Sequence, residues 1–125
     1  GSVYVYQIDD SSTWVLRGSP MRGEQVQDWF GWAVKLSGDG NVLIASSLGT
    51  NGPGGFKAGR SRVFRFVGNS WVQIGDPIDG GNPDDNSGAS VAISEDGSVV
   101  AVGAPFNSDA APRAGLVQVF QGISF

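Results

Sequence analysis

The side chains that could perform acid–base chemistry in this sequence are carboxylates, because it contains no histidine and no cysteine. General acid–base and nucleophilic catalysis need a base held beside its partner, and two carboxylates can serve, as in glycoside hydrolysis. Four aspartates recur in pairs, Asp28 with Asp85 and Asp39 with Asp96. Tight turns and strand entries already explain them. We therefore predict no catalytic residues and no enzyme, and a carboxylate glycosidase or metal-assisted enzyme is the weakest hypothesis.

Aromatic residues are the other candidates for chemistry, in this case for binding. Trp29 and Trp32 surround a Phe-Gly pair, and indole faces stack on sugar rings or on aromatic groups of a partner. The alternative is that they fill space between packed sheets, as large aromatic residues usually do. Two Gly-rich or polar segments, 49–58 and 106–114, are expected as surface loops that carry contacts. The candidate ligand-binding residues are therefore Trp29, Trp32, Phe56, Phe106, Asn107 and Asp109.

These candidates belong to a unit that the chain contains twice, at 28–47 and 85–104. Gly31 and Gly88 stand at equivalent places, 57 residues apart (88 − 31 = 57). Each unit has an alternating run, an Asp-Gly pair and an apolar run, which together predict an antiparallel hairpin. The second run is apolar at successive positions, which favours a strand covered on both faces.

Two more elements extend the repeat to four strands. A segment that begins with Gly and ends with an aromatic residue occurs at 1–6, 59–64 and 115–120, and a Trp-initiated segment occurs at 14–23 and 71–80. Trp14 and Trp71, which begin the latter segment, are predicted to lie in the core. A period of 50–60 residues with four strands is typical of a β-propeller blade.

We therefore predict an all-β fold of antiparallel propeller blades with the strand order 3-4, 1-2-3-4, 1-2-3. Residues 1–125 are expected to form one propeller segment with a partial blade at 1–27, a complete blade at 28–80 and a partial blade at 81–125; Phe125 is interpreted as the start of a fourth strand. Closed propellers need about four to eight blades. The chain is thus expected to belong to a longer array or to associate with copies of itself.

The motif Asp28-Trp29-Phe30-Gly31, with the Gly103-Ala104-Pro105 segment of the second copy, resembles the FG-GAP repeat of integrin-α-type propellers. The Trp-initiated fourth strand and the Asp-Gly hairpin are most similar to FG-GAP-like arrays of secreted and surface proteins of marine microbes and algae. The motif is divided between the copies, since Ser46-Ser47-Leu48 replaces Gly-Ala-Pro in the first and Ser87-Gly88 replaces Phe-Gly in the second. The resemblance implies an extracellular or cell-surface location.

Calcium is the cofactor that this resemblance raises. Integrin-type repeats have several aspartates in the loop between strands one and two, whereas 37–41 and 94–98 have one or two carboxylates each. Ca²⁺ prefers six to eight oxygen ligands. We therefore expect no cofactor and no integrin-type metal site here. The oxygen-rich segments 82–86 and 107–109 are interpreted as solvated turns, with calcium binding as the alternative.

Composition limits the partners. The chain has 125 residues, 20 of them Gly, and a net charge of −4, which disfavours nucleic acid because such binding depends on Lys and Arg. No apolar run approaches the roughly 20 residues of a membrane span, so membrane insertion is not expected. We predict a structural or adhesive interaction module that presents loops to a protein, to copies of itself or to further blades. A lectin-like propeller that binds a glycan is the alternative.

Overall fold

The computed structural model describes residues 1–122, which form eleven β-strands and no helix. Accordingly, no helix in this part of the chain could cross a membrane. The interpretation of Phe125 lies outside the described residues. The strands are β1 (Ser2–Val3), β2 (Tyr6–Ile8), β3 (Trp14–Leu16), β4 (Met21–Arg22), β5 (Phe30–Leu36), β6 (Val42–Ser47), β7 (Arg60–Val67), β8 (Ser70–Asp79), β9 (Ser90–Ile93), β10 (Val99–Ala104) and β11 (Leu116–Gln121).

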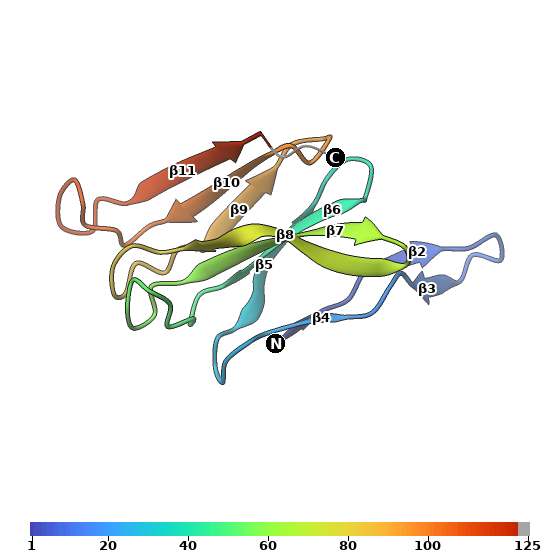
Figure 1. The fold of residues 1–125 in the computed structure, drawn as a ribbon, viewed down its shortest axis with the longest axis horizontal. Coiled ribbons are helices and arrows are strands. Elements are labelled where there is room, and N and C mark those ends of the chain that lie inside the picture. The colour runs from blue at the N-terminus through green and yellow to red at the C-terminus, as the bar shows by residue number, and fades with distance from the viewer. Residues whose placement is uncertain (123–125) are drawn as a thin grey trace.

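The strands form sheets in the order that the repeat predicts. A complete antiparallel sheet, β5-β6-β7-β8, stands between a three-stranded sheet, β9-β10-β11, and two small sheets, β1-β4 and β2-β3 (Figure 1). The two small sheets are the third and fourth strands of one blade, interrupted midway. The complete blade bends at the same place, where a register shift separates Ser61 from Val63 in the β7-β8 pair. The predicted all-β propeller fold is therefore confirmed.

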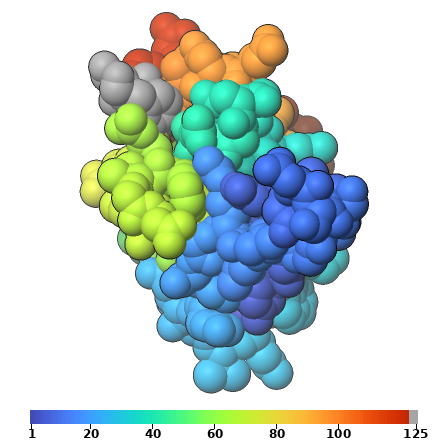
Figure 2. Space-filling model, turned by 90° about the vertical axis from the view of Figure 1, so that its right-hand side faces the viewer, coloured from blue at the N-terminus to red at the C-terminus, as the bar shows by residue number. Residues whose placement is uncertain are grey.

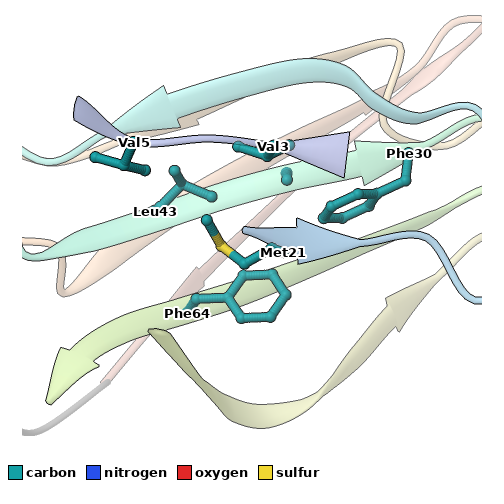
Figure 3. Packing of buried hydrophobic residues seen from close by; sticks show 7 residues of the cluster. Val3, Val5, Met21, Phe30, Leu43 and Phe64 are labelled. Atoms are coloured by element: carbon teal, nitrogen blue, oxygen red, sulfur yellow. The ribbon is translucent and has the colours of Figure 1, made fainter. Parts of the chain in front are cut away.

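The central strand β6 is buried on both faces, which explains its unbroken apolar sequence. Leu43 and Ala45 face a cluster shared with the first half-blade, while Val42 and Ile44 face a cluster shared with the β9-β10-β11 sheet. Successive side chains of a strand point to opposite faces, so one strand serves both clusters. Burying each large aliphatic side chain contributes about 1.5–3 kcal/mol. The blades are held together mainly by these two layers, one of which is shown in Figure 3.

The two Asp-Gly hairpins are built alike. Asp39 Oδ1 accepts hydrogen bonds from the Ser37 hydroxyl at 2.7 Å and from the Asn41 backbone N–H at 3.0 Å. Asp96 accepts the equivalent bonds from Ser94 at 2.9 Å and from the Ser98 backbone at 3.0 Å. The glycine that follows each aspartate has a positive φ, as tight turns require. The carboxylates thus have the turn contacts that the sequence predicts.

Of the two tryptophans predicted to lie in the core, Trp71 does so and Trp14 does not. Trp71 packs against the first cluster, and its indole N–H donates to the Arg17 carbonyl at 2.9 Å. Trp14, predicted to lie in the core as well, is 67% exposed. The reason is that Arg17 and Gly18 of the first half-blade cover Trp71, whereas nothing in residues 1–122 takes the equivalent place over Trp14.

Candidate interaction site

The candidate site is built on a buried carboxylate at the entry to β5. Asp28 accepts hydrogen bonds from the backbone N–H groups of Glu24 at 2.7 Å, Gln25 at 3.1 Å and Phe30 at 3.0 Å. Its own carbonyl accepts the Gly49 N–H at 2.9 Å. The aspartate therefore fixes the connection between blades and ties it to the loop that follows β6.

The charge of Asp28 is stabilised by these donors. Burial alone would raise the pKa of the Asp28 carboxyl, and it is the largest single influence. The backbone N–H groups of Gln25, Phe30 and Glu24 together outweigh it, so the pKa lies below its ordinary value of 3.8. Asp28 is therefore an ionised structural anchor at neutral pH.

The second copy of the unit repeats the anchor with a different partner. Asp85 Oδ2 accepts the Asn82 backbone N–H at 3.2 Å and the Asn107 side-chain N–H at 2.9 Å. Asn107, a predicted ligand-binding residue, is buried, so it acts here as a link between the two loops. Asp109, another predicted residue, accepts a hydrogen bond from the Asn82 side chain at 3.1 Å.

Three of the predicted aromatic residues meet at one place on the first copy. The rings of Trp29 and Trp32 lie 6.1 Å apart at an angle of 33°, and these residues are 47% and 58% exposed. The Lys57 ammonium lies 5.4 Å from the Trp29 ring centre and 5.2 Å from that of Phe56. We call Trp29, Trp32, Phe56 and Lys57 the first rim patch. Phe30, between the two tryptophans, is buried in the core instead.

The remaining predicted residues lie on the second copy. Phe106 is exposed, and the Arg113 guanidinium lies 4.4 Å from its ring centre. Together with Asp84 and Asp109 these residues border an open hollow of about 580 Å³. We call Phe106, Asp109 and Arg113 the second rim patch. The structure thus divides the predicted binding residues between two patches, except for Asn107, which is buried.

The two patches are neighbours, because their loops are hydrogen-bonded to each other. The Phe56 carbonyl accepts the Asp84 N–H at 2.8 Å, and the Lys57 carbonyl accepts the Asn86 N–H at 3.2 Å. Sequence analysis missed Lys57 and Arg113, which stand at equivalent places in the repeat and both have a positive φ. A cation at the same place in both loops was the signal that could have indicated them.

Trp29 is held in an unfavourable backbone conformation. Its φ is +58°, and the equivalent residue of the second copy, Asn86, has a φ of +51°. Asparagine tolerates this left-handed region, whereas most other side chains are strained there. Strained residues persist where the surroundings over-determine them, and they cluster at functional sites. The repeat geometry demands this conformation, and the first copy places a half-exposed indole on it.

The repeated four-stranded sheets, packed face to face through two apolar layers, define a segment of a β-propeller. Within it, residues 78–120 match the family model of the FG-GAP repeat, which together with the all-β blades confirms the resemblance drawn from the sequence. No curated protein sequence matches the chain. Among residues 1–122 there is no group of three or more Asp, Glu, His or Cys side chains placed to hold a metal ion.

Proposed function

We propose that this chain is a non-enzymatic structural or adhesive module, located outside the cell or at its surface, that contacts a protein partner through the first rim patch. The observation that carries the proposal is the half-exposed indole of Trp29 on a strained backbone, beside the exposed Trp32. Tryptophan is enriched among residues that dominate binding interfaces. The FG-GAP match at 78–120 supports an interaction module of this kind.

The first rim patch has the features of a binding anchor. Lys57 lies between Trp29 and Phe56, and a cation over aromatic faces helps to fix their orientation. The loop that presents Phe56 is tied to the next blade by the Phe56 and Lys57 carbonyls. A rigid patch loses little conformational freedom on binding. The proposal includes no cofactor, because the carboxylates of Asp39, Asp85, Asp96 and Asp109 accept hydrogen bonds from neighbouring groups.

Carbohydrate binding is the second candidate, and the same exposure favours it. Buried indoles would oppose a lectin, but Trp29 and Trp32 both present ring surface to solvent. Exposed aromatic faces can stack on sugar rings. Both candidate functions use the first rim patch, and they differ in whether a protein or a glycan binds to it.

One experiment tests both. Beads carrying the wild-type chain are applied to surfaces coated with extracellular matrix of the source organism, before and after periodate treatment, which destroys sugar diols. The double variant Trp29→Ala/Trp32→Ala is expected to lose retention at least tenfold. Trp14→Ala removes another exposed indole away from the rim and is expected to retain wild-type binding.

The outcomes separate the candidates. Retention that survives periodate supports a protein partner, and retention lost with periodate supports a glycan. In the second case, titration with the released glycans should quench tryptophan fluorescence in the wild type and not in Trp32→Ala. If the double variant binds as well as the wild type, the first rim patch is not the contact surface and the proposal fails.

A further inference from the structure

Asn51 and Gly52 form the one Asn-Gly pair of the sequence, in the loop 49–58 that carries Phe56 and Lys57. This loop lies at the end of the sheets opposite to the hairpin turns that face the viewer in Figure 2 (Figure 1). An asparagine side chain can react with the backbone N–H of the next residue, because the two groups can close a five-membered ring. Glycine obstructs this reaction least, since it has no Cβ. The pair is therefore a candidate site of chemical modification.

The surroundings of the Asn51 side chain favour attack on its Cγ atom. Asn51 is exposed, and its Oδ1 accepts the Lys57 backbone N–H at 2.8 Å. This donor stabilises the negative charge that develops on Oδ1 when a nucleophile bonds to Cγ. The Nδ2 group, which must leave, donates no hydrogen bond to any group in residues 1–122. The side-chain amide is thus polarised, and its leaving group is not held back.

The attacking N–H group distinguishes this pair from the Asp-Gly pairs of the chain, at 39–40, 79–80 and 96–97. In all of them the glycine N–H donates to a backbone carbonyl, at 3.0 Å for Gly40, 2.9 Å for Gly80 and 3.0 Å for Gly97. Gly52 faces Gly55 across an isolated bridge in which the bond with good geometry runs the other way, from the Gly55 N–H to the Gly52 carbonyl at 3.0 Å. A bonded N–H must first lose its acceptor before it can react, so the Gly52 N–H is the most available of the four.

Asn51 also differs from three other asparagines of the chain. Asn82 precedes a proline, which has no N–H. The residue after Asn86 donates its N–H to a backbone carbonyl at 2.9 Å. Asn107 is buried, and its side-chain N–H donates to a carboxylate at 2.9 Å. Each of the three lacks a condition for the reaction that Asn51 fulfils.

We propose that Asn51 deamidates spontaneously in the folded protein. A base in the solvent removes the proton of the Gly52 N–H, the nitrogen bonds to Asn51 Cγ, and the Cγ–Nδ2 bond breaks. The amide nitrogen leaves as ammonia after it takes up a proton from water. Water then opens the resulting succinimide ring at one of its two carbonyls. Opening at the side-chain carbonyl gives aspartate, and opening at the backbone carbonyl gives isoaspartate.

The modification changes the charge and the backbone of the loop. Either product adds one negative charge to a chain whose formal net charge is −4. Isoaspartate also lengthens the backbone by one carbon atom, at a residue whose N–H and carbonyl are both held by the Gln25 side chain, at 3.0 Å and 3.2 Å. The loop of the first rim patch is therefore altered, but the reaction needs no partner and can be tested whether or not that patch binds one.

Peptide mapping of the folded wild type during incubation at mildly alkaline pH tests the proposal. Trypsin releases residues 36–57 by cleavage after Lys35 and Lys57, and fragment masses locate the change within this peptide. In water labelled with heavy oxygen, the product should carry one solvent oxygen at residue 51. Methylation by protein isoaspartate methyltransferase should report the isoaspartate fraction. A sample digested at the start of the incubation corrects for reaction during digestion.

Variants test the two reacting groups. Gly52→Ala puts a Cβ beside the attacking nitrogen and is expected to slow the reaction at least tenfold. Asn51→Gln would need a six-membered ring and is expected to remain unmodified at this position. The matched control Gly81→Ala adds the same methyl group in open space and should react at Asn51 like the wild type. Circular dichroism checks that each variant keeps the all-β fold.

The same mapping in urea separates the effect of the fold from that of the sequence. In the folded protein, Asn51 should change while the three Asp-Gly pairs form no isoaspartate. In urea their glycine N–H groups are released, and isoaspartate should appear at these pairs as well. An Asn51 that stays unmodified in the folded protein overturns the proposal, whatever happens in urea. A Gly52→Ala rate equal to that of the wild type overturns it too, and so does isoaspartate that forms at the folded Asp-Gly turns as early as at Asn51.

Discussion

The two copies of the rim have the same backbone and different surfaces. At the entry to the hairpin, the first copy has Trp29 where the second has Asn86, and both residues adopt a positive φ. In the loop between strands two and three, Lys57 corresponds to Arg113. The first copy exposes two indoles and a phenyl ring beside a half-buried lysine, and the second exposes one phenyl ring and an arginine beside aspartates. The two copies therefore share the backbone conformation of the rim and differ in the side chains that this backbone carries.

The two copies also differ in the groups that donate hydrogen bonds to the aspartate at the entry to the hairpin. Asp28 accepts three backbone N–H groups, whereas Asp85 accepts one backbone group and the side chain of Asn107. A hydrogen bond to a charged group makes a net contribution of about 1.5–3 kcal/mol to stability. The first copy thus depends on its aspartate alone, and the second shares the task with a buried asparagine.

The largest predicted effect tests this difference. Asp28→Asn is expected to lower the free energy of unfolding by about 2–4 kcal/mol, because a neutral amide is a weaker acceptor and turns an N–H group toward N–H donors. Asp85→Asn is expected to cost about 1–2 kcal/mol, because the Asn107 amide can reorient toward it. Urea unfolding at neutral pH measures both. Equal losses would show that the two anchors are equivalent in spite of their different partners.

The pH dependence of the free energy of unfolding, compared between the wild type and Asp28→Asn, tests whether the charge of Asp28 is stabilising. Because the folded-state pKa of Asp28 lies below 3.8, its contribution is fully present above the unfolded-state pKa and is lost as the pH falls through the lower folded-state value. The stability gap between the wild type and Asp28→Asn should therefore narrow as the pH is lowered from about 5 to below that value. Asp39 and Asp96 also have lowered pKa values, chiefly through hydrogen bonds from Ser37 and Ser98, but both proteins share them. A difference in the free energy of unfolding that does not change with pH would contradict a stabilising charge on Asp28.

An exchange at the strained position is the next largest effect. Trp29→Asn is expected to change the free energy of unfolding by less than about 1 kcal/mol, because relief of the left-handed strain offsets the lost ring contacts. The reverse change, Asn86→Trp, is expected to cost about 1–2 kcal/mol. Thermal and urea unfolding of the two variants check this. A loss of about 3–5 kcal/mol for Trp29→Asn, typical of removing a buried Trp, would mean that the indole serves packing and not contact.

The comparison of the two copies shows which features of the structure were predictable from the sequence. The Asp-Gly hairpins, the doubly buried β6 and the order of strands were predictable, because each follows from a local pattern that occurs twice. The burial of Asn107 and the exposure of Trp14 were not, since each depends on which segment lies opposite in space. Lys57 was missed, although Arg113 stands at the equivalent place of the repeat, because only the fold shows which aromatic rings lie beside each cation. The approach of Lys57 to the rings of both Trp29 and Phe56 required the fold, because 27 residues separate the two aromatic residues (56 − 29 = 27).

The smallest predicted effect is that of calcium on the Tm. It concerns the rim of the second copy, which is more acidic than that of the first. Asp84, Asp85 and Asp109 border the hollow of the second rim patch, whereas the first has Lys57 near its centre. The oxygens of Asp85 and Asp109 already accept N–H groups of Asn82 and Asn107, and a cation would have to displace these donors. Ca²⁺ also prefers six to eight oxygens. Addition of calcium or of a chelator is therefore expected to leave the Tm unchanged, in the wild type and in Asp109→Asn alike. A rise in Tm with calcium that disappears in Asp109→Asn would show instead that the copies differ by a metal site, with the second copy adapted to a cation and the first to an aromatic contact.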